Sequence, residues 1–126
     1  MSEVEVKLDG QKVPDYPFIV YQAQAMRTAA ELENKDADML HAAMGIASEG
    51  GELLGAFKSA FAYGKELDLQ NVIEEMGDLM WFIALMCHSM GITMDYVAVR
   101  NIEKLYARYP EKFTQEDAIA RADKLQ

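Results

Sequence analysis

Two pairs of carboxylates on neighbouring predicted helices constrain this 126-residue chain more than any other feature. Glu49 and Glu52 lie in ASEGGELLGAFK, and Glu75 and Asp78 lie in NVIEEMGDLMWF. Residues three apart on a helix share one face, with β-carbons about 5–6 Å apart, so each helix presents two acids side by side. A short polar break over residues 64–70 separates the two helices. The pattern therefore predicts an antiparallel helical hairpin whose acid pairs face each other.

Four carboxylates gathered at one point repel each other, and a folded protein has to compensate for this repulsion. Like charges at this spacing destabilise a helix by about 0.2–0.5 kcal/mol per pair, and four in one cleft cost more unless a cation neutralises them. Neither pair has a histidine in the ligand position that di-iron helical bundles use, and the chain has a single cysteine. An all-oxygen donor set favours Mg²⁺, with Mn²⁺ as the alternative. We predict a divalent-metal site at Glu49, Glu52, Glu75 and Asp78.

Composition and charge limit the classes of partner. The formal net charge of −9 argues against a nucleic-acid-binding surface, which would be basic. The lone Cys87 excludes an internal disulfide and suits a reducing cytosol. Residues 1–10 lack the apolar core of a signal peptide, and the longest apolar run, residues 79–87, is too short to span a membrane. We expect a single cytoplasmic domain over residues 1–126, with no nucleic-acid or membrane partner.

The remaining pattern predicts an all-α fold, an antiparallel bundle of four main helices followed by a short C-terminal helix. Caps and proline positions set the expected ends. The expected helices run from Pro17 to about Leu32, from about Ala37 to Ala62, from the cap Asp68 to about Met90, from the cap Thr93 to the residue before Pro110, and briefly after the cap Thr114. The alternating start VEVKLDGQKV, with Asp9-Gly10 as a turn, is compatible with a small β-hairpin.

Two further features lie near the acids in sequence. Trp81 shares a helix face with Glu75 and Asp78, one turn further on, and is either a core residue or an aromatic wall for a flat ligand. On the fourth helix, one polar stripe contains Asn101, Lys104 and Arg108. Such a stripe is either a solvated face or a set of contacts for phosphate oxygens.

These residues resemble a known family. ASEGGEL, the lysine in AFKSAFAYGK, and EEMGDLMWF are similar to the MazG-like nucleotide pyrophosphohydrolases of the all-α NTP pyrophosphatase superfamily. The hallmark of that family is an ExxE pair followed on the next helix by an ExxD pair. NIEKLYARYPEKF resembles the family's segment after the metal helices, and YQAQAMRTA resembles its first helix. The main likeness covers roughly residues 40–113.

The resemblance implies Mg²⁺-dependent hydrolysis of a nucleoside or deoxynucleoside triphosphate to the monophosphate and pyrophosphate, in cleansing or control of nucleotide pools. It implies that the four acids bind the metal. A carboxylate not fully used as a ligand is free to accept the proton of the attacking water, and we predict Glu49 or Glu52 for this role. The implied substrate contacts are Lys58, Trp81, Asn101, Lys104, Arg108, Gln22 and Arg27. Lys58 fits least well, since a straight helix turns it away from Glu52.

Two other functions remain open at this point. One is a phosphoribosyl-ATP pyrophosphohydrolase, which would use the same metal helices on a different nucleotide. The other is a non-enzymatic helical interaction module whose acids only decorate the surface. The nine methionines and many aromatic residues of so small a bundle predict a homodimer or homotetramer, with the nucleotide site completed across a subunit boundary.

Overall fold

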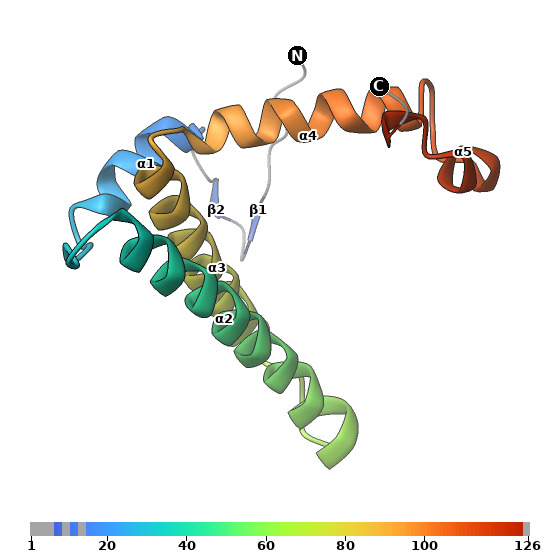
Figure 1. Ribbon diagram of the computed structural model, residues 1–126. Coiled ribbons are helices and arrows are strands. Elements are labelled where there is room, and N and C mark those ends of the chain that lie inside the picture. Colours follow the sequence, from blue (N-terminus) through green and yellow to red (C-terminus); the bar gives the residue numbers. More distant parts are fainter. Residues whose placement is uncertain (1–6, 9–10, 13–14, 125–126) are drawn as a thin grey trace.

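The computed structural model describes residues 7–8, 11–12 and 15–124, and nearly all regular structure in them is helical (Figure 1). Its elements are α1 (Phe18–Met26), α2 (Lys35–Tyr63), α3 (Leu69–Met90), α4 (Met94–Arg108), α5 (Gln115–Ala120) and the 3₁₀ helix η1 (Ala122–Lys124). The predicted all-α class is confirmed.

The N-terminal hairpin is not borne out as an element of the fold. Strands β1 (Lys7–Leu8) and β2 (Gln11–Lys12) pair antiparallel over two residues each. Asp9 and Gly10, the predicted turn, lie outside the described residues. Four paired residues form no layer against the helices.

The predicted caps set most helix ends. The side chains of Asp68, Thr93 and Thr114 each accept a hydrogen bond from the backbone N–H three residues on, at the starts of α3, α4 and α5. Gly64 and Gly91 end α2 and α3 in the left-handed conformation, with φ of 66° and 71°. Helices α2 to α5 therefore begin and end close to the predicted residues.

Helix α1 is shorter than predicted, ending at Met26 instead of about Leu32. A longer helix would need the Ala25 carbonyl to accept the N–H of Ala29. That carbonyl instead accepts hydrogen bonds from the Thr28 hydroxyl at 2.7 Å and from the Trp81 indole at 3.2 Å. A contact with α3 thus replaces the next helical turn.

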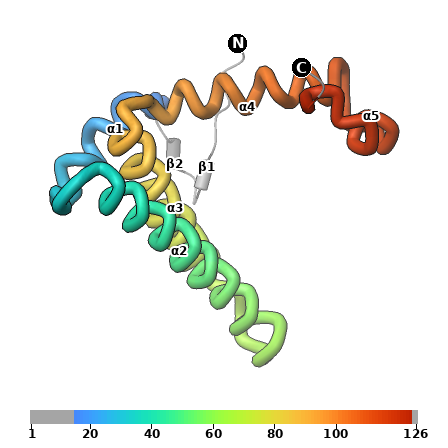
Figure 2. Tube along the Cα trace, viewed as in Figure 1, coloured from blue at the N-terminus to red at the C-terminus, as the bar shows by residue number. Residues whose placement is uncertain are grey.

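Helices α2 and α3 run antiparallel, side by side, as one long hairpin (Figures 1 and 2). The Phe82 ring of α3 packs against α2 at Gly45, which is buried. A β-carbon at this position would lie 2.1 Å from the ring of Phe82. The hairpin predicted from the acid pairs is present, and glycine is required where its helices meet.

The predicted four-helix bundle is wrong in its arrangement. Helix α4 leaves α3 at an angle of 98° and extends away from the α2–α3 hairpin (Figure 2). The Gln22 side-chain amide on α1 fixes this corner, because it donates to the Ile92 carbonyl at 3.0 Å and accepts from the Met94 N–H at 2.7 Å. Because Gln22 and Ile92 are 70 residues apart, the hydrophobic periodicity of the sequence gives no sign of this contact.

The core is small and lies at this corner, where α1 crosses α3 and the start of α4. Its buried members are Ala25, Ala84, Cys87 and Met94. Cys87 has a free thiol and is buried in this cluster as a small hydrophobic residue. Elsewhere many apolar side chains are exposed; Phe61 on α2 is 81% exposed and Tyr106 on α4 is 67% exposed. Among the described residues, no single helix has both the length and the apolar character of a membrane span.

Candidate metal centre and substrate-binding residues

Three of the four predicted acids converge between α2 and α3. Oxygen atoms of Glu49, Glu75 and Asp78 all lie within 4.8 Å of one another. Glu49 and Glu75 are half-buried and Asp78 is exposed. Two acids come from one helix at a spacing of three, and the antiparallel packing of the hairpin brings the third opposite them. The arrangement offers oxygen ligands from two helices to one point.

Burial and the neighbouring acids raise the pKa of Glu75 above its ordinary value. Partial burial raises its pKa, a hydrogen bond with Glu49 raises it further, and the charges of Glu49, Glu52 and Asp78 add to the effect. A site that favours a shared proton in this way would also favour a cation in its place. Oxygen donors alone, from carboxylates, fit Mg²⁺ or Mn²⁺.

Glu52 takes a different position from the other three acids. It is exposed, and its oxygens lie outside the group within 4.8 Å. It is nonetheless close enough for its charge to raise the pKa of Glu75. The structure thus brings together three predicted ligands and places the fourth at their edge.

Helix α1 lies beside the acids. The pKa of the Tyr21 hydroxyl is raised by burial and then by the charges of Asp78 and Tyr16. The sequence reading did not single out Tyr21 as a site residue. Its spacing of four from the buried Ala25 could have indicated that it faces α3.

Two of the three residues predicted to contact the nucleotide from α1 and α3, Trp81 and Gln22, make hydrogen bonds within the fold instead. The Trp81 indole donates to Ala25 and, at 2.9 Å, to the Thr28 hydroxyl, and its ring packs on the core. Both ends of the Gln22 amide are bonded at the α3–α4 corner. Arg27 is exposed at the C-terminal end of α1.

The basic residues predicted to bind phosphate lie apart from the acids. The Lys58 ammonium sits 5.8 Å from the centre of the Tyr63 ring, toward the end of α2. Asp78 precedes the end of α3 by about 18 Å, and Lys104 lies about 15 Å along α4, at 1.5 Å per residue. With α3 and α4 at 98°, the stripe of Asn101, Lys104 and Arg108 does not meet the carboxylates of its own chain.

Arg108 has a partner that the sequence reading missed. Its Nε donates to Asp123 Oδ1 at 2.6 Å, and its Nη2 donates to Asp123 Oδ2 at 2.9 Å. The Arg108 and Asp123 side chains are 18% and 2% exposed. This contact lowers the pKa of Asp123 and raises that of Arg108. A bidentate ion pair thus ties η1 to the end of α4.

Comparison with known proteins identifies the family of the chain. The family model of the MazG nucleotide pyrophosphohydrolase domain matches residues 37–113, which include α3, α4 and nearly all of α2. The Gene 37 protein of Mycobacterium phage L5 is 28% identical over 100 residues, covering 71% of this chain and 85% of that protein. No solved structure matches the chain. Since the family model spans more than half of its length, the chain belongs to the MazG nucleotide pyrophosphohydrolase family.

Proposed function

We propose that this protein hydrolyses a nucleoside or deoxynucleoside triphosphate with water to the monophosphate and pyrophosphate, with Mg²⁺ or Mn²⁺ as cofactor. The observation that carries the proposal is the meeting of Glu49, Glu75 and Asp78 within 4.8 Å between facing helices. Membership of the MazG family supports the same reaction class. The biological role would be cleansing or control of nucleotide pools.

The four acids would have two roles, metal binding and acceptance of a proton. Glu49, Glu75 and Asp78 would hold the cation, with Glu52 as a further ligand at the edge. A divalent ion bound there would offset phosphate charge and lower the pKa of a coordinated water. Glu52 is exposed and lies outside the convergent group, so we favour it over Glu49 as the acceptor of the water's proton.

The substrate site would be shared between copies of the chain. The stripe of Asn101 and Lys104 lies on an arm that points away from the carboxylates of the same chain. In a homodimer or homotetramer, α4 of one copy could lie beside the α2–α3 hairpin of another. The exposed apolar side chains of both parts support such an assembly.

Asp78→Asn and Glu52→Gln test the catalytic centre. We expect each change to abolish metal-dependent pyrophosphate release while circular dichroism stays near wild type, since both positions are exposed. Glu74→Gln is the matched control, because Glu74 neighbours Glu75 but is exposed and outside the carboxylate group. Full activity in both site variants would exclude this assignment of the centre.

A substrate panel decides between the nucleotide classes. Canonical and modified ribo- and deoxyribonucleoside triphosphates are compared with phosphoribosyl-ATP at fixed Mg²⁺ or Mn²⁺, with pyrophosphate release as the readout. Hydrolysis of phosphoribosyl-ATP alone would favour the alternative function, a phosphoribosyl-ATP pyrophosphohydrolase. A chain that hydrolyses none of them, and whose melting temperature Mg²⁺ leaves unchanged, would instead be the non-enzymatic helical module.

A further inference from the structure

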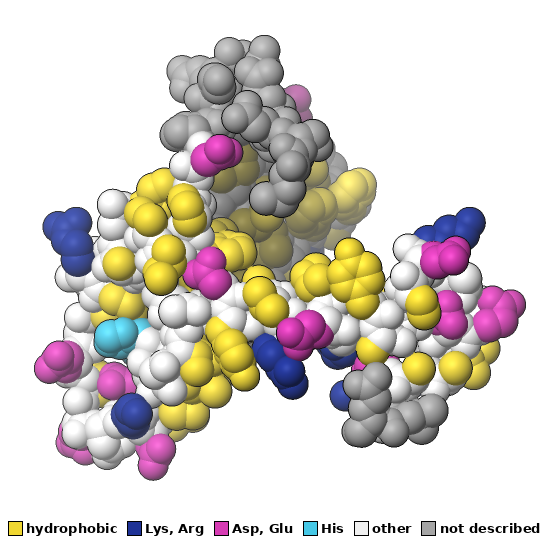
Figure 3. Space-filling model, turned by 90° about the horizontal axis from the view of Figure 1, so that it is seen from above, with side chains coloured by type: hydrophobic (Ala, Val, Ile, Leu, Met, Phe, Trp, Pro, Cys, Tyr) yellow, Lys and Arg dark blue, Asp and Glu magenta, His cyan; other side chains and the backbone are white. Residues whose placement is uncertain are grey.

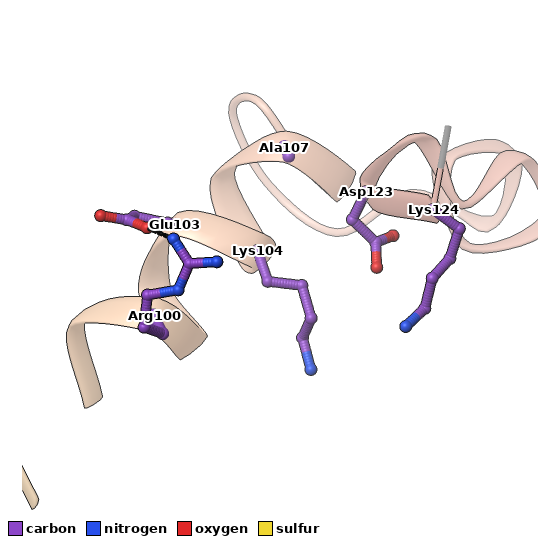
Figure 4. Close-up of a pocket in the computed structure, with 6 residues that line it drawn as sticks. All are labelled: Arg100, Glu103, Lys104, Ala107, Asp123 and Lys124. Carbon is purple, nitrogen blue, oxygen red and sulfur yellow. Dashed lines mark hydrogen bonds and ion pairs between the residues drawn. The ribbon is translucent and has the colours of Figure 1, made fainter. Parts of the chain in front are cut away.

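A polar hollow lies between α4 and η1, away from the carboxylates. It encloses about 310 Å³. Figure 4 shows its six lining residues, which are Arg100, Glu103, Lys104, Ala107, Asp123 and Lys124. Ala107 stands next to Arg108 and one turn after Lys104, and its small side chain lines the hollow.

The charge of this hollow is opposite to that of the protein as a whole. Arg100 pairs with Glu103 at 3.0 Å, and the carboxylate of Asp123 faces Arg108. Each acid in the wall therefore has a guanidinium beside it. Lys104 and Lys124 add two more positive charges, and their side chains extend in the same direction on either side of Asp123 (Figure 4). A chain of net charge −9 has here a local excess of positive charge.

The position of Lys124 depends on the ion pair beside it. Asp123 precedes Lys124 in η1, and its side chain is 98% buried against Arg108. Two parallel N–H···O bonds fix both the distance and the orientation of the joined groups. Breaking this pair would release the short 3₁₀ turn that carries Lys124.

We propose that Lys104 and Lys124 form a binding pocket for a phosphate-type oxyanion, and that Arg108 is a positioning residue for η1 instead of a phosphate ligand. The pocket adds Lys124, from outside the matched family region, to the phosphate-binding groups of the chain. The identity of its ligand, the triphosphate tail or the released pyrophosphate, rests on the proposed function. Two ammonium groups around one hollow suit an anion carrying more than one negative charge.

Pyrophosphate binding to the full chain tests the pocket, measured by isothermal titration calorimetry at low salt without added metal. We expect Lys104→Gln and Lys124→Gln each to weaken binding about fivefold or more, and Lys112→Gln, a change of the same kind outside the pocket, to alter it less than twofold. Absence of pyrophosphate binding by the wild type would overturn the proposal. So would unchanged binding by Lys124→Gln.

Asp123→Asn separates the two roles that Arg108 could have. If Arg108 positions η1, this variant loses affinity about as strongly as Lys124→Gln, because Lys124 is no longer held in place. If Asp123 instead occupies the site of the phosphate, the variant frees Arg108 and binds pyrophosphate more tightly, which would overturn the positioning role. Limited proteolysis of the C-terminal segment reports its release independently: faster cleavage is expected, and an unchanged rate would argue against the anchor.

Pyrophosphate binding is measured without metal and without turnover, so its result is separate from that of the activity assay. Glu74→Gln should bind pyrophosphate at the α4–η1 pocket as the wild type does, since Glu74 is exposed and lies outside both the carboxylate group and the pocket. If Lys124→Gln loses turnover although its carboxylates are unchanged, the pocket binds the substrate or the product of the proposed reaction. Retained turnover together with lost pyrophosphate binding would overturn the link to the substrate.

Discussion

Among single residues, the three convergent acids have the clearest consequence for the protein. Oxygen atoms of Glu49, Glu75 and Asp78 lie within 4.8 Å of one another, and their charges make stability depend on pH and on a bound cation.

The raised pKa of Glu75 predicts how stability varies with pH in the absence of metal. A carboxyl whose pKa is higher in the folded state than its ordinary value of 4.5 binds its proton more tightly when folded. Stability conferred by that proton is complete below pH 4.5 and is lost as pH rises through the folded-state pKa. With a chelator present, we expect the melting temperature of Glu75→Gln to exceed that of the wild type at pH 7 and to converge with it near pH 4.

Added Mg²⁺ should reverse the order of the two proteins at pH 7, because the cation stabilises the wild-type cluster more than the cluster without one of its charges. Glu74→Gln serves as the control in both series. A Glu75→Gln variant that melts below the wild type in chelator would contradict mutual repulsion among these acids.

The acids were the most predictable part of the candidate site. Their spacing alone placed Glu75 and Asp78 on one face and Glu49 opposite them. The edge position of Glu52 was not predictable, because it depends on how the two helices rotate against each other. The contacts of Gln22 and Arg108 were not predictable either, because each depends on where a distant segment lies.

At the scale of elements, helix ends were predictable wherever a local signal sets them. Asp68, Thr93 and Thr114 act through bonds within their own turns, and Gly91 needs only its own backbone conformation. The end of α1 was not predictable, because the Trp81 indole on α3 takes the Ala25 carbonyl. Where a tertiary contact competes with the next turn, periodicity overestimates the helix.

The Phe82 ring packed against Gly45 makes a larger residue at this position destabilising. In an open helical position, alanine gains about 0.5–1 kcal/mol over glycine. At Gly45 the new methyl group would overlap the Phe82 ring, and we expect Gly45→Ala to lower the free energy of unfolding by roughly 1–2 kcal/mol. Gly51→Ala is the control; it has open space around its β-carbon and should be slightly stabilising. Urea denaturation of both variants measures the difference, and a stabilising Gly45→Ala would contradict the packing.

At the scale of the whole molecule, helix content was predictable and the arrangement was not. One glutamine side chain, Gln22, bridges α1 to the corner between α3 and α4, a contact between segments far apart in sequence. The missing bundle contacts leave apolar side chains in solvent along α4, among charged ones, as seen from above (Figure 3). Tyr96, Val99, Ile102 and Tyr106 form one such stripe and are 50–67% exposed.

This stripe predicts self-association. We expect light scattering after size exclusion to give the mass of a dimer or tetramer, since a helix face of this kind is stable when another surface covers it. Ile102→Asp should shift the protein toward a smaller species, whereas Glu33→Lys, a charge change in the α1–α2 loop, should not. A monomeric wild type at micromolar concentration would remove the shared substrate site.

The contact between Gly45 and Phe82 has a consequence for the metal centre. Gly45 lies one helical turn before Glu49, and Phe82 lies one turn after Asp78, so this contact is adjacent to the acids on both helices. The packing of Phe82 against Gly45 would then set the distance between the two helices, and with it the distance between the carboxylates. Residues without ligand atoms would in this way decide which ionic radius the site accepts. The ratio of Mg²⁺ to Ca²⁺ affinity, compared between wild type and Gly45→Ala, measures that selectivity directly.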